Sequence, residues 1–194
     1  MGRPAKLSCE AITEHTVRLV AKEGLHCTTI RAISKSLKVN EAAIYRYYTS
    51  KEAIFWDAYA RIVEEMIADK QLLTQSPKPF RELLRDWIDL TFAYFDRHPD
   101  AFTYVLLLPP PVELKTSASH QELLLTQGRL FKALARQALA KDEMRDISPE
   151  LALSHFTGLM LNVPRLIREN QLDGPALQYV DEVAAAAWRV LQPV

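Results

Sequence analysis

The sequence is poor in the residues that build disulfide-bonded or strand-rich proteins. Two cysteines in 194 residues give no disulfide framework and indicate a reducing, cytoplasmic location. Only five glycines occur, and no alternating apolar run is bounded by turn residues, so we expect no strands. The longest apolar runs fall far short of the ~20 residues that a membrane-spanning helix needs. These shortages predict a soluble helical protein with no membrane partner.

The patterns of an enzyme or a metalloprotein are also missing. We find no Gly-rich phosphate loop, no nucleophile elbow and no carboxylate pair in an apolar setting. Cys9 and Cys27 lie near His15 and His26 in the sequence, but no CxxC or HxxxH spacing supports a zinc site. We therefore expect no catalytic residue, no metal and no cofactor.

Positive charge is concentrated at the N-terminus, although the net charge of the chain is zero. Residues 1–51 contain nine Lys or Arg against four Asp or Glu, whereas the remainder contains fifteen against twenty. A basic segment followed by an acidic one is typical of a DNA-binding domain on a body that repels DNA. The alternative interpretation is surface charge that is unevenly scattered. The charge distribution therefore indicates DNA binding only together with a sequence motif.

Residues 28–51, TTIRAISKSLKVNEAAIYRYYTSK, begin with the pattern of a short amphipathic helix. A hydroxyl at Thr28 or Thr29 can accept a hydrogen bond from the unpaired N–H groups of the first turn. Apolar residues then recur at three- and four-residue spacing from Ile30 to Leu37, which predicts one buried face.

A second helix is predicted for residues 41–48, after a turn that contains Lys38. Asn40 can cap this helix, and Ile44 and Tyr48 form its buried face. Lys38 would be strained if its φ were positive, because the side chain disfavours that conformation. The opposite face carries Glu41, Ala42, Ala43, Tyr45, Arg46 and Tyr47. This layout is a helix-turn-helix, whose second helix lies in the DNA major groove.

At these residues the chain resembles the tetracycline-repressor (TetR) family of bacterial transcriptional regulators. The resemblance rests on Thr28-Thr29, Ile33-Ser34, Lys38-Val39-Asn40, Ala42-Ala43, Ile44-Tyr45, Tyr47-Tyr48 and Ser50-Lys51-Glu52. It extends over roughly residues 12–59, with departures from the family pattern at Lys38, Ala42 and Tyr47-Tyr48. It implies an all-α fold with a three-helix N-terminal head and a larger C-terminal helical body for ligand binding and dimerisation.

The resemblance also implies which residues of the head touch DNA. The residues expected at phosphates are Thr29, Arg31, Tyr45, Tyr47 and Lys51. The residues expected at base edges are Glu41, Ala42, Ala43 and Arg46. Pure packing is the alternative for Tyr45, and a solvated cap is the alternative for Lys51. The expected DNA-binding residues are Thr28, Thr29, Arg31, Asn40, Glu41, Ala42, Ala43, Tyr45, Arg46, Tyr47 and Lys51.

Helical patterns continue through the rest of the chain. We predict a DNA-binding head over residues 1–50, a connecting helix and linker over 51–76, and a body over 77–194. The stretch WIDLTFAYF, residues 87–95, is apolar on nearly every side and should be central in the body. Pro164 lies inside a predicted helix and should kink it or shift its register.

Aromatic residues with a few polar ones predict a ligand cavity in the body. The expected lining is Trp87, Thr91, Tyr94, Phe95, Phe102, Tyr104, Gln127, Phe131, His155 and Asn162. The alternative for each is ordinary core packing. No Lys/Arg or carboxylate cluster falls among these positions, so the expected ligand is mostly apolar.

Wide apolar faces on the last two long helices predict a homodimer interface, since small residues allow close helix approach. The residues concerned are Phe156, Leu159, Met160, Val163, Val180, Val183, Ala184, Ala187, Trp188 and Leu191. The alternative is that both faces complete the core of a single chain.

These patterns together predict a homodimeric transcriptional regulator, more specifically a repressor. It should bind a palindromic operator in double-stranded DNA and be released by a small, mostly apolar effector. The alternative is a helical small-molecule-binding protein or enzyme whose N-terminal head is merely structural.

Overall fold

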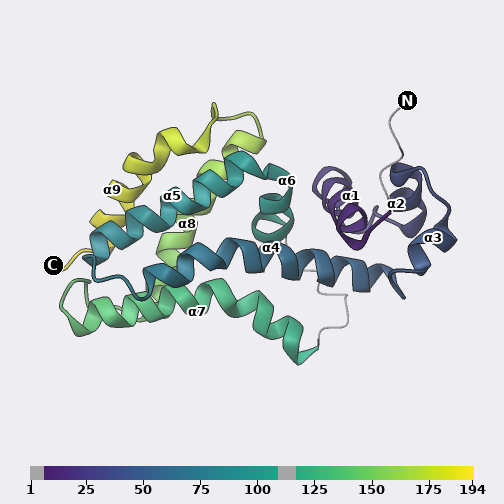
Figure 1. The fold of residues 1–194 in the computed structure, drawn as a ribbon. Coiled ribbons are helices and arrows are strands. Elements are labelled where there is room, and N and C mark those ends of the chain that lie inside the picture. Colours follow the sequence, from purple (N-terminus) through teal and green to yellow (C-terminus); the bar gives the residue numbers. More distant parts are fainter. Residues whose placement is uncertain (1–6, 109–116) are drawn as a thin grey trace. The chain divides into compact units, whose positions relative to one another are not determined.

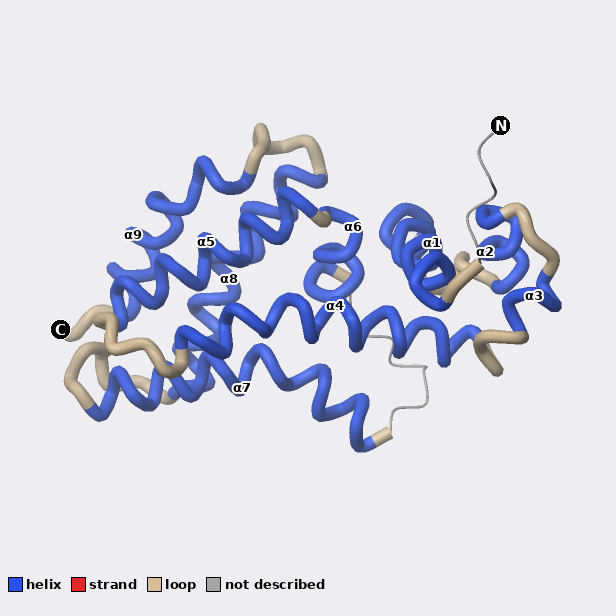
Figure 2. The backbone as a smooth tube through the Cα atoms, in the orientation of Figure 1, coloured by secondary structure: helices blue, strands red, loops and turns tan. Residues whose placement is uncertain are grey.

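The computed structural model describes residues 7–108 and 117–194, and every regular element in these ranges is a helix (Figures 1 and 2). The all-α prediction is therefore confirmed. The helices are α1 (Cys9–Glu23), α2 (Ile30–Leu37), α3 (Glu41–Tyr45), α4 (Lys51–Leu73), α5 (Phe80–Arg97), α6 (Pro99–Phe102), the π-helix η1 (Thr103–Leu107), α7 (Ala118–Ala140), α8 (Pro149–Arg168), the 3-10 helix η2 (Ala176–Tyr179) and α9 (Val180–Leu191).

The chain divides into two compact units that differ from the boundaries expected at residues 50 and 76. The head unit comprises Met1–Ile62 and Asp100–His120, and the body unit comprises Val63–Pro99 and Gln121–Val194. The head unit includes η1 because this element packs against α1. Helix α4 is continuous and contributes residues to both units.

Side-chain caps set the starts of the first three helices. Ser8 accepts a hydrogen bond from the Ala11 N–H at 3.1 Å, and Thr29 accepts one from Ala32 at 3.1 Å. Asn40 caps α3 by accepting from the Ala43 N–H at 2.8 Å. Each bond satisfies an N–H that has no partner within its own helix.

The core of the head is built from isoleucines of successive helices. Ile12, Ile30, Ile33, Ile44 and Ile54 are buried together, and Tyr48 joins them. Helix α2 packs against both α1 and α3, so this cluster holds the two helices of the motif at a fixed angle. The buried faces that the three- and four-residue spacing predicted are therefore present.

The body unit is organised around α5, which packs against α8, α9 and η2. Asp96 near the end of α5 accepts from the Ala176 N–H at 2.8 Å and the Leu177 N–H at 3.0 Å. These bonds satisfy the first turn of η2 and lead the chain into α9. Helix α8 continues past Pro164 to Arg168.

Over residues 7–108 and 117–194, no helix combines the length and hydropathy that crossing a bilayer requires.

Candidate DNA-binding surface and body cavity

The exposed surface of α3 is the first candidate site. Glu41, Ala42, Tyr45 and Arg46 are exposed, and Ile44 between them is fully buried. Helix α3 ends at Tyr45, three residues before the expected end, and Arg46 caps it. The helix thus presents a short face with one basic side chain at its C-terminal end.

The turn before α3 contains Lys38 with a positive φ, the conformation in which we expected its side chain to be strained. Lys38 has φ 57° and ψ 38°, the left-handed region that side chains disfavour. Its N–H donates to the Lys35 carbonyl at 3.1 Å, and the Val39 N–H donates to the Ser34 carbonyl at 3.0 Å. Two backbone hydrogen bonds therefore close α2 and redirect the chain into α3.

Three of the residues expected to contact phosphates are Thr29, Arg31 and Lys51, and each has a hydrogen-bond donor to offer a phosphate. Arg31 is exposed and forms no ion pair among the described residues. Thr29 uses its oxygen as a cap, which leaves its hydroxyl hydrogen for another acceptor. The Lys51 ammonium lies 5.3 Å from the centre of the Phe55 ring.

Two predicted DNA contacts are contradicted by burial, and a third residue, Tyr47, is exposed but uses its hydroxyl within the chain. Thr28 is fully buried and its hydroxyl donates to the Gly24 carbonyl at 3.0 Å. Ala43 is only 8% exposed, because it lies on the side of α3 that faces the isoleucine core. The Tyr47 hydroxyl donates to the Leu7 carbonyl at 2.7 Å, so its proton is used within the chain.

A polar contact that the sequence reasoning missed holds the end of the motif. The Tyr48 hydroxyl donates to the carboxylate of Asp57 in α4. Burial and this carboxylate raise the pKa of Tyr48, so the phenol remains a donor. Asp57 lies one turn before Arg61 in α4 and also accepts a hydrogen bond from it. The Asp57 carboxylate was the sequence feature that could have suggested a polar partner for Tyr48.

In the body, three of the aromatic side chains pack directly on one another. The Phe131 and Phe156 rings are stacked with centroids 4.4 Å apart, and the Trp87 ring meets Phe131 edge-on at 5.7 Å. Rings at these distances are in contact. This cluster is therefore packed core, although Trp87 and Phe131 were expected to line a cavity.

Lys70 is a buried cation beside this cluster. Its side chain is 1% exposed, and its ammonium lies 5.2 Å from the centre of the Trp87 ring. The ammonium donates to the Gln127 side-chain oxygen at 3.2 Å. Burial lowers the pKa of Lys70 from 10.5 to about 7, because an apolar environment disfavours the charged form.

The sequence reasoning missed Lys70, although a signal was present. Val63, Met66 and Lys70 follow one another at three- and four-residue spacing, so the lysine continues the buried stripe of α4.

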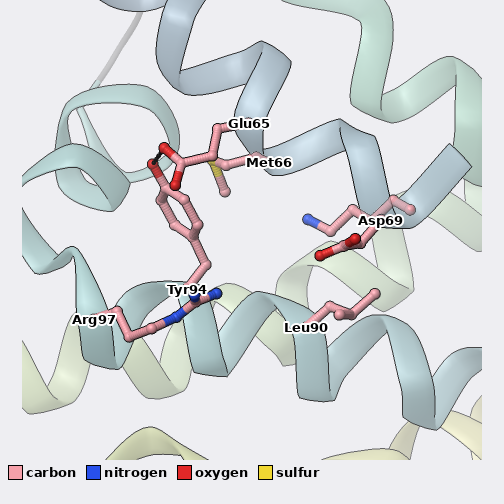
Figure 3. Close-up of a pocket in the computed structure, with 7 residues that line it drawn as sticks. Glu65, Met66, Asp69, Leu90, Tyr94 and Arg97 are labelled. Carbon is pink, nitrogen blue, oxygen red and sulfur yellow. Dashed lines mark hydrogen bonds between the residues drawn. The ribbon is translucent and has the colours of Figure 1, made fainter.

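A cavity of about 120 Å³ lies in the body unit, and Lys70 is among the residues that line it. Figure 3 shows Glu65 and Met66 of α4 on one side of it and Leu90 and Tyr94 of α5 on the other. The Tyr94 hydroxyl donates to Glu65 at 3.2 Å across its wall, and burial raises the pKa of Tyr94. The lining residues are Glu65, Met66, Asp69, Lys70, Leu90, Tyr94 and Arg97. Of these only Tyr94 was predicted, and the expectation of a wall without charged residues is wrong for this cavity.

Other residues expected at a ligand lie elsewhere. Phe102 and Tyr104 belong to the head unit, where the Tyr104 hydroxyl donates to the Phe55 carbonyl at 2.9 Å. Asn162 is exposed, and its side-chain oxygen accepts from Arg165 at 2.6 Å. These three are therefore not brought to the cavity of the body unit.

The remaining predicted lining residues are buried or half-buried within the body unit. Thr91 is fully buried, and its hydroxyl donates to the Trp87 carbonyl one turn earlier in α5 at 2.7 Å. Phe95 is buried as well. His155 is half-buried, with a buried Nδ1 that has no hydrogen-bond partner among the described residues.

The predicted dimer residues fall into two groups. Six are buried within a single chain, which contradicts their assignment to an interface: Phe156, Met160, Val180, Val183, Ala187 and Leu191. Four are half-buried: Leu159, Val163, Ala184 and Trp188. The first group was misassigned because α9 packs against α5 and α8 of its own chain.

Comparisons with known proteins support the helix-turn-helix assignment of the head. Residues 12–58 match the family model described as bacterial regulatory proteins, tetR family. The chain is 27% identical over 128 residues to the HTH-type transcriptional repressor NicS of Pseudomonas putida, covering 66% of this chain and 56% of NicS. It is 28% identical over 111 residues to the HTH-type transcriptional regulator YerO of Bacillus subtilis, covering 55% of this chain and 38% of YerO.

Two solved structures share the fold over most of the chain. One is a TetR family transcription regulator from Marinobacter aquaeolei VT8, with TM-score 0.77 and 19% identity over 95% of both chains. The other is the transcriptional regulator FadR from Bacillus subtilis, solved in complex with stearoyl-CoA. It has TM-score 0.78 and 17% identity, covering 93% of this chain and 97% of FadR.

The head is a helix-turn-helix with an exposed second helix, the motif that DNA-binding proteins place in the major groove, and it is joined to an all-helical body. Residues 12–58 match the TetR family of bacterial regulators, and the fold is shared with a solved structure of that family over most of the chain.

Proposed function

We propose that the chain is a ligand-responsive repressor that binds a palindromic operator as a homodimer and is released by a small, mostly apolar effector. The observation that carries this proposal is the position of Arg46. It is exposed at the end of α3, directly after a helix whose opposite side is anchored in the isoleucine core. Such an arginine can pair with the guanine edge in the major groove. The name of NicS, a repressor, supports the sign of regulation.

The homodimer is proposed from the side chains that α8 and α9 leave half-buried. Leu159 and Val163 lie one turn apart on α8, and Ala184 and Trp188 lie one turn apart on α9. Apolar rows on two adjacent helices pack well against the same rows of a second copy, giving a four-helix interface. A two-fold dimer then requires an operator with two-fold symmetry.

The effector is proposed from the cavity in the body unit. Its volume of about 120 Å³ suits a small molecule, and Met66 and Leu90 line it beside the charged residues Glu65, Asp69, Lys70 and Arg97. The FadR structure was solved in complex with stearoyl-CoA, whose acyl chain is apolar, and this supports an effector with an apolar part. Release requires that the effector bind more tightly to the dimer whose heads do not fit the operator.

Selection of bound sequences from random duplex DNA tests the proposal. We expect an enriched inverted repeat with half-sites about one helical turn, or a multiple of it, apart. Affinity for that operator should fall steeply with salt, because phosphate contacts release counterions. The exposed double variant Arg31→Ala/Arg46→Ala should enrich nothing. A parent chain that enriches no sequence and shows no salt dependence would instead be a helical ligand-binding protein or enzyme with a structural head.

A further inference from the structure

Lys70 carries a buried ammonium without an acidic partner. No carboxylate oxygen of the described residues lies within 4.0 Å of it, and its hydrogen bond goes to the neutral Gln127 side chain. An ammonium has three N–H donors, so two have no hydrogen-bond acceptor in this part of the chain. Burial of an unpaired charge is unfavourable, and a structural role alone would be filled better by an apolar residue.

The residue that carries this buried ammonium also lines the cavity. Lys70 lines the cavity together with the apolar side chains of Met66 and Leu90. The cavity volume of about 120 Å³ is close to that of an engineered cavity that holds one benzene molecule, about 150 Å³. An anionic group would here find a donor, and a small apolar group would find a surface.

We propose that this cavity binds a small monocarboxylate, whose carboxylate accepts hydrogen bonds from the Lys70 ammonium and whose apolar part contacts Met66 and Leu90. This assignment rests on the proposed effector-binding function and specifies the chemical class of the effector.

The charges around the cavity favour a monoanion over other ions. Glu65 and Asp69 of α4 and Arg97 of α5 also line it, and all three are exposed. Water screens exposed charges, so they act mainly on the part of the ligand that remains near the mouth. A dianion would be repelled by Glu65 and Asp69, and a cation would be repelled by the buried ammonium.

Carboxylate binding should be linked to proton uptake. Lys70 has a pKa of about 7 because of its burial, and an anion beside it raises that pKa again. Above pH 7 the free protein must therefore gain a proton to bind, so affinity should fall by up to about tenfold per pH unit.

Other titratable groups lie around the same cavity. They are Glu65 and Asp69 of α4, with Tyr94 and Arg97 of α5; His98 lies 3.8 Å from Glu65. The Gln127 side chain from α7 is uncharged. A variant without the Lys70 amine measures what these groups contribute by themselves.

Titration calorimetry on the full chain tests the assignment with three acids, benzoate, hexanoate and octanoate, and their primary amides. At least one acid should bind the parent about tenfold or more tightly than its amide, with proton uptake at about pH 8. Lys70→Met should lose both the preference and the proton uptake. Lys141→Met, at an exposed lysine, should keep both.

A second variant guards against a folding defect in Lys70→Met. Gln127→Glu places a carboxylate beside the ammonium at the position of the present hydrogen bond, so it should exclude the acids while circular dichroism stays unchanged. The assignment is overturned if none of the acids binds the parent at about 10 mM. Equal affinity for acid and amide, or an unchanged preference in Lys70→Met or Gln127→Glu, also overturns it.

The outcomes separate this assignment from the proposed function. Lys70-dependent acid binding in a chain that selects no DNA would reject the repressor alone. An uncharged effector that releases parent and Lys70→Met from the operator at the same concentration would reject the carboxylate site alone.

Discussion

The Tyr48 hydroxyl donates a hydrogen bond to the Asp57 carboxylate, which joins the end of the helix-turn-helix to α4. Asp57 also accepts from the Arg61 side chain at 3.1 Å. The orientation of α3 therefore depends on a polar link as well as on the isoleucine core.

Tyr48→Phe should lower the free energy of unfolding of the chain by about 1–2 kcal/mol, because it removes a hydrogen bond to a charged acceptor. Urea unfolding followed by circular dichroism measures this change. Tyr45→Phe is the matched control, since Tyr45 is 54% exposed and its hydroxyl has no hydrogen bond among the described residues. Equal stability of the two variants would mean that the Tyr48–Asp57 contact is not stabilising.

Lys38→Gly should raise the free energy of unfolding by roughly 0.5–1 kcal/mol. Lys38 has φ 57°, and glycine adopts this conformation without a steric cost, although it also increases the entropy of the unfolded chain. Lys35→Gly, at a helical position three residues earlier, should lower stability by about 1 kcal/mol. Denaturant midpoints that shift in the same direction for both variants would contradict the role of the turn.

Arg46→Ala should change which operator sequences are preferred, whereas Lys51→Ala should weaken binding to all sequences alike. Both follow from the proposed contacts, to a base edge and to a phosphate respectively, and the second variant should reduce the salt slope by about one unit. Fluorescence anisotropy with the selected operator and point-mutated versions of it distinguishes these effects. Parent-like binding in both variants would show that α3 does not read DNA.

Three neighbouring alanines in α9 give a graded test of the proposed interface. Ala185→Glu, at an exposed position, should leave the protein unchanged, and Ala184→Glu, at a half-buried one, should produce folded monomers. Ala187→Glu should unfold the chain, because Ala187 is fully buried and an unpaired charge there is costly. Light scattering and circular dichroism report mass and folding; a dimer of Ala184→Glu at parent concentrations would reject this interface.

The lowered pKa of Lys70 predicts how the free energy of unfolding depends on pH. Its pKa is about 7 in the folded chain and 10.5 in the unfolded chain, so between these values the unfolded state binds more protons. The free energy of unfolding of the parent should therefore rise with pH across this window relative to Lys70→Met, by up to roughly 1.4 kcal/mol per pH unit. Below about pH 7 the lysine is protonated in both states and its burial is fully unfavourable. Parallel stability curves for the two proteins would contradict the lowered pKa.

Local features of the head could be predicted from the sequence because they depend on neighbouring residues. Thr29 and Asn40 cap their helices as their side chains predicted. The sequence predicted strain at Lys38 only if its φ were positive, and the structure gives it φ 57°. Each of these involves contacts within about four positions in the chain.

Features that depend on distant segments were predicted less well. The apolar faces of α8 and α9 look alike whether their own chain or a second copy covers them, so Ala187 was assigned to an interface. The cavity was placed among the aromatic rings because rings are large, yet Phe131 and Phe156 stack on each other. Lys70 was overlooked because a lysine is usually exposed, and only the packing of α4 against α7 reveals its burial.

The closeness of the Lys70 ammonium to the Trp87 ring makes an internal optical reporter possible. An indole beside a charge changes its emission when that charge is neutralised or moves, and the two groups are 5.2 Å apart. The chain has two other tryptophans, Trp56 and Trp188. Replacing both with phenylalanine leaves a single indole, whose spectrum would follow the protonation of the cavity in real time and without an added dye.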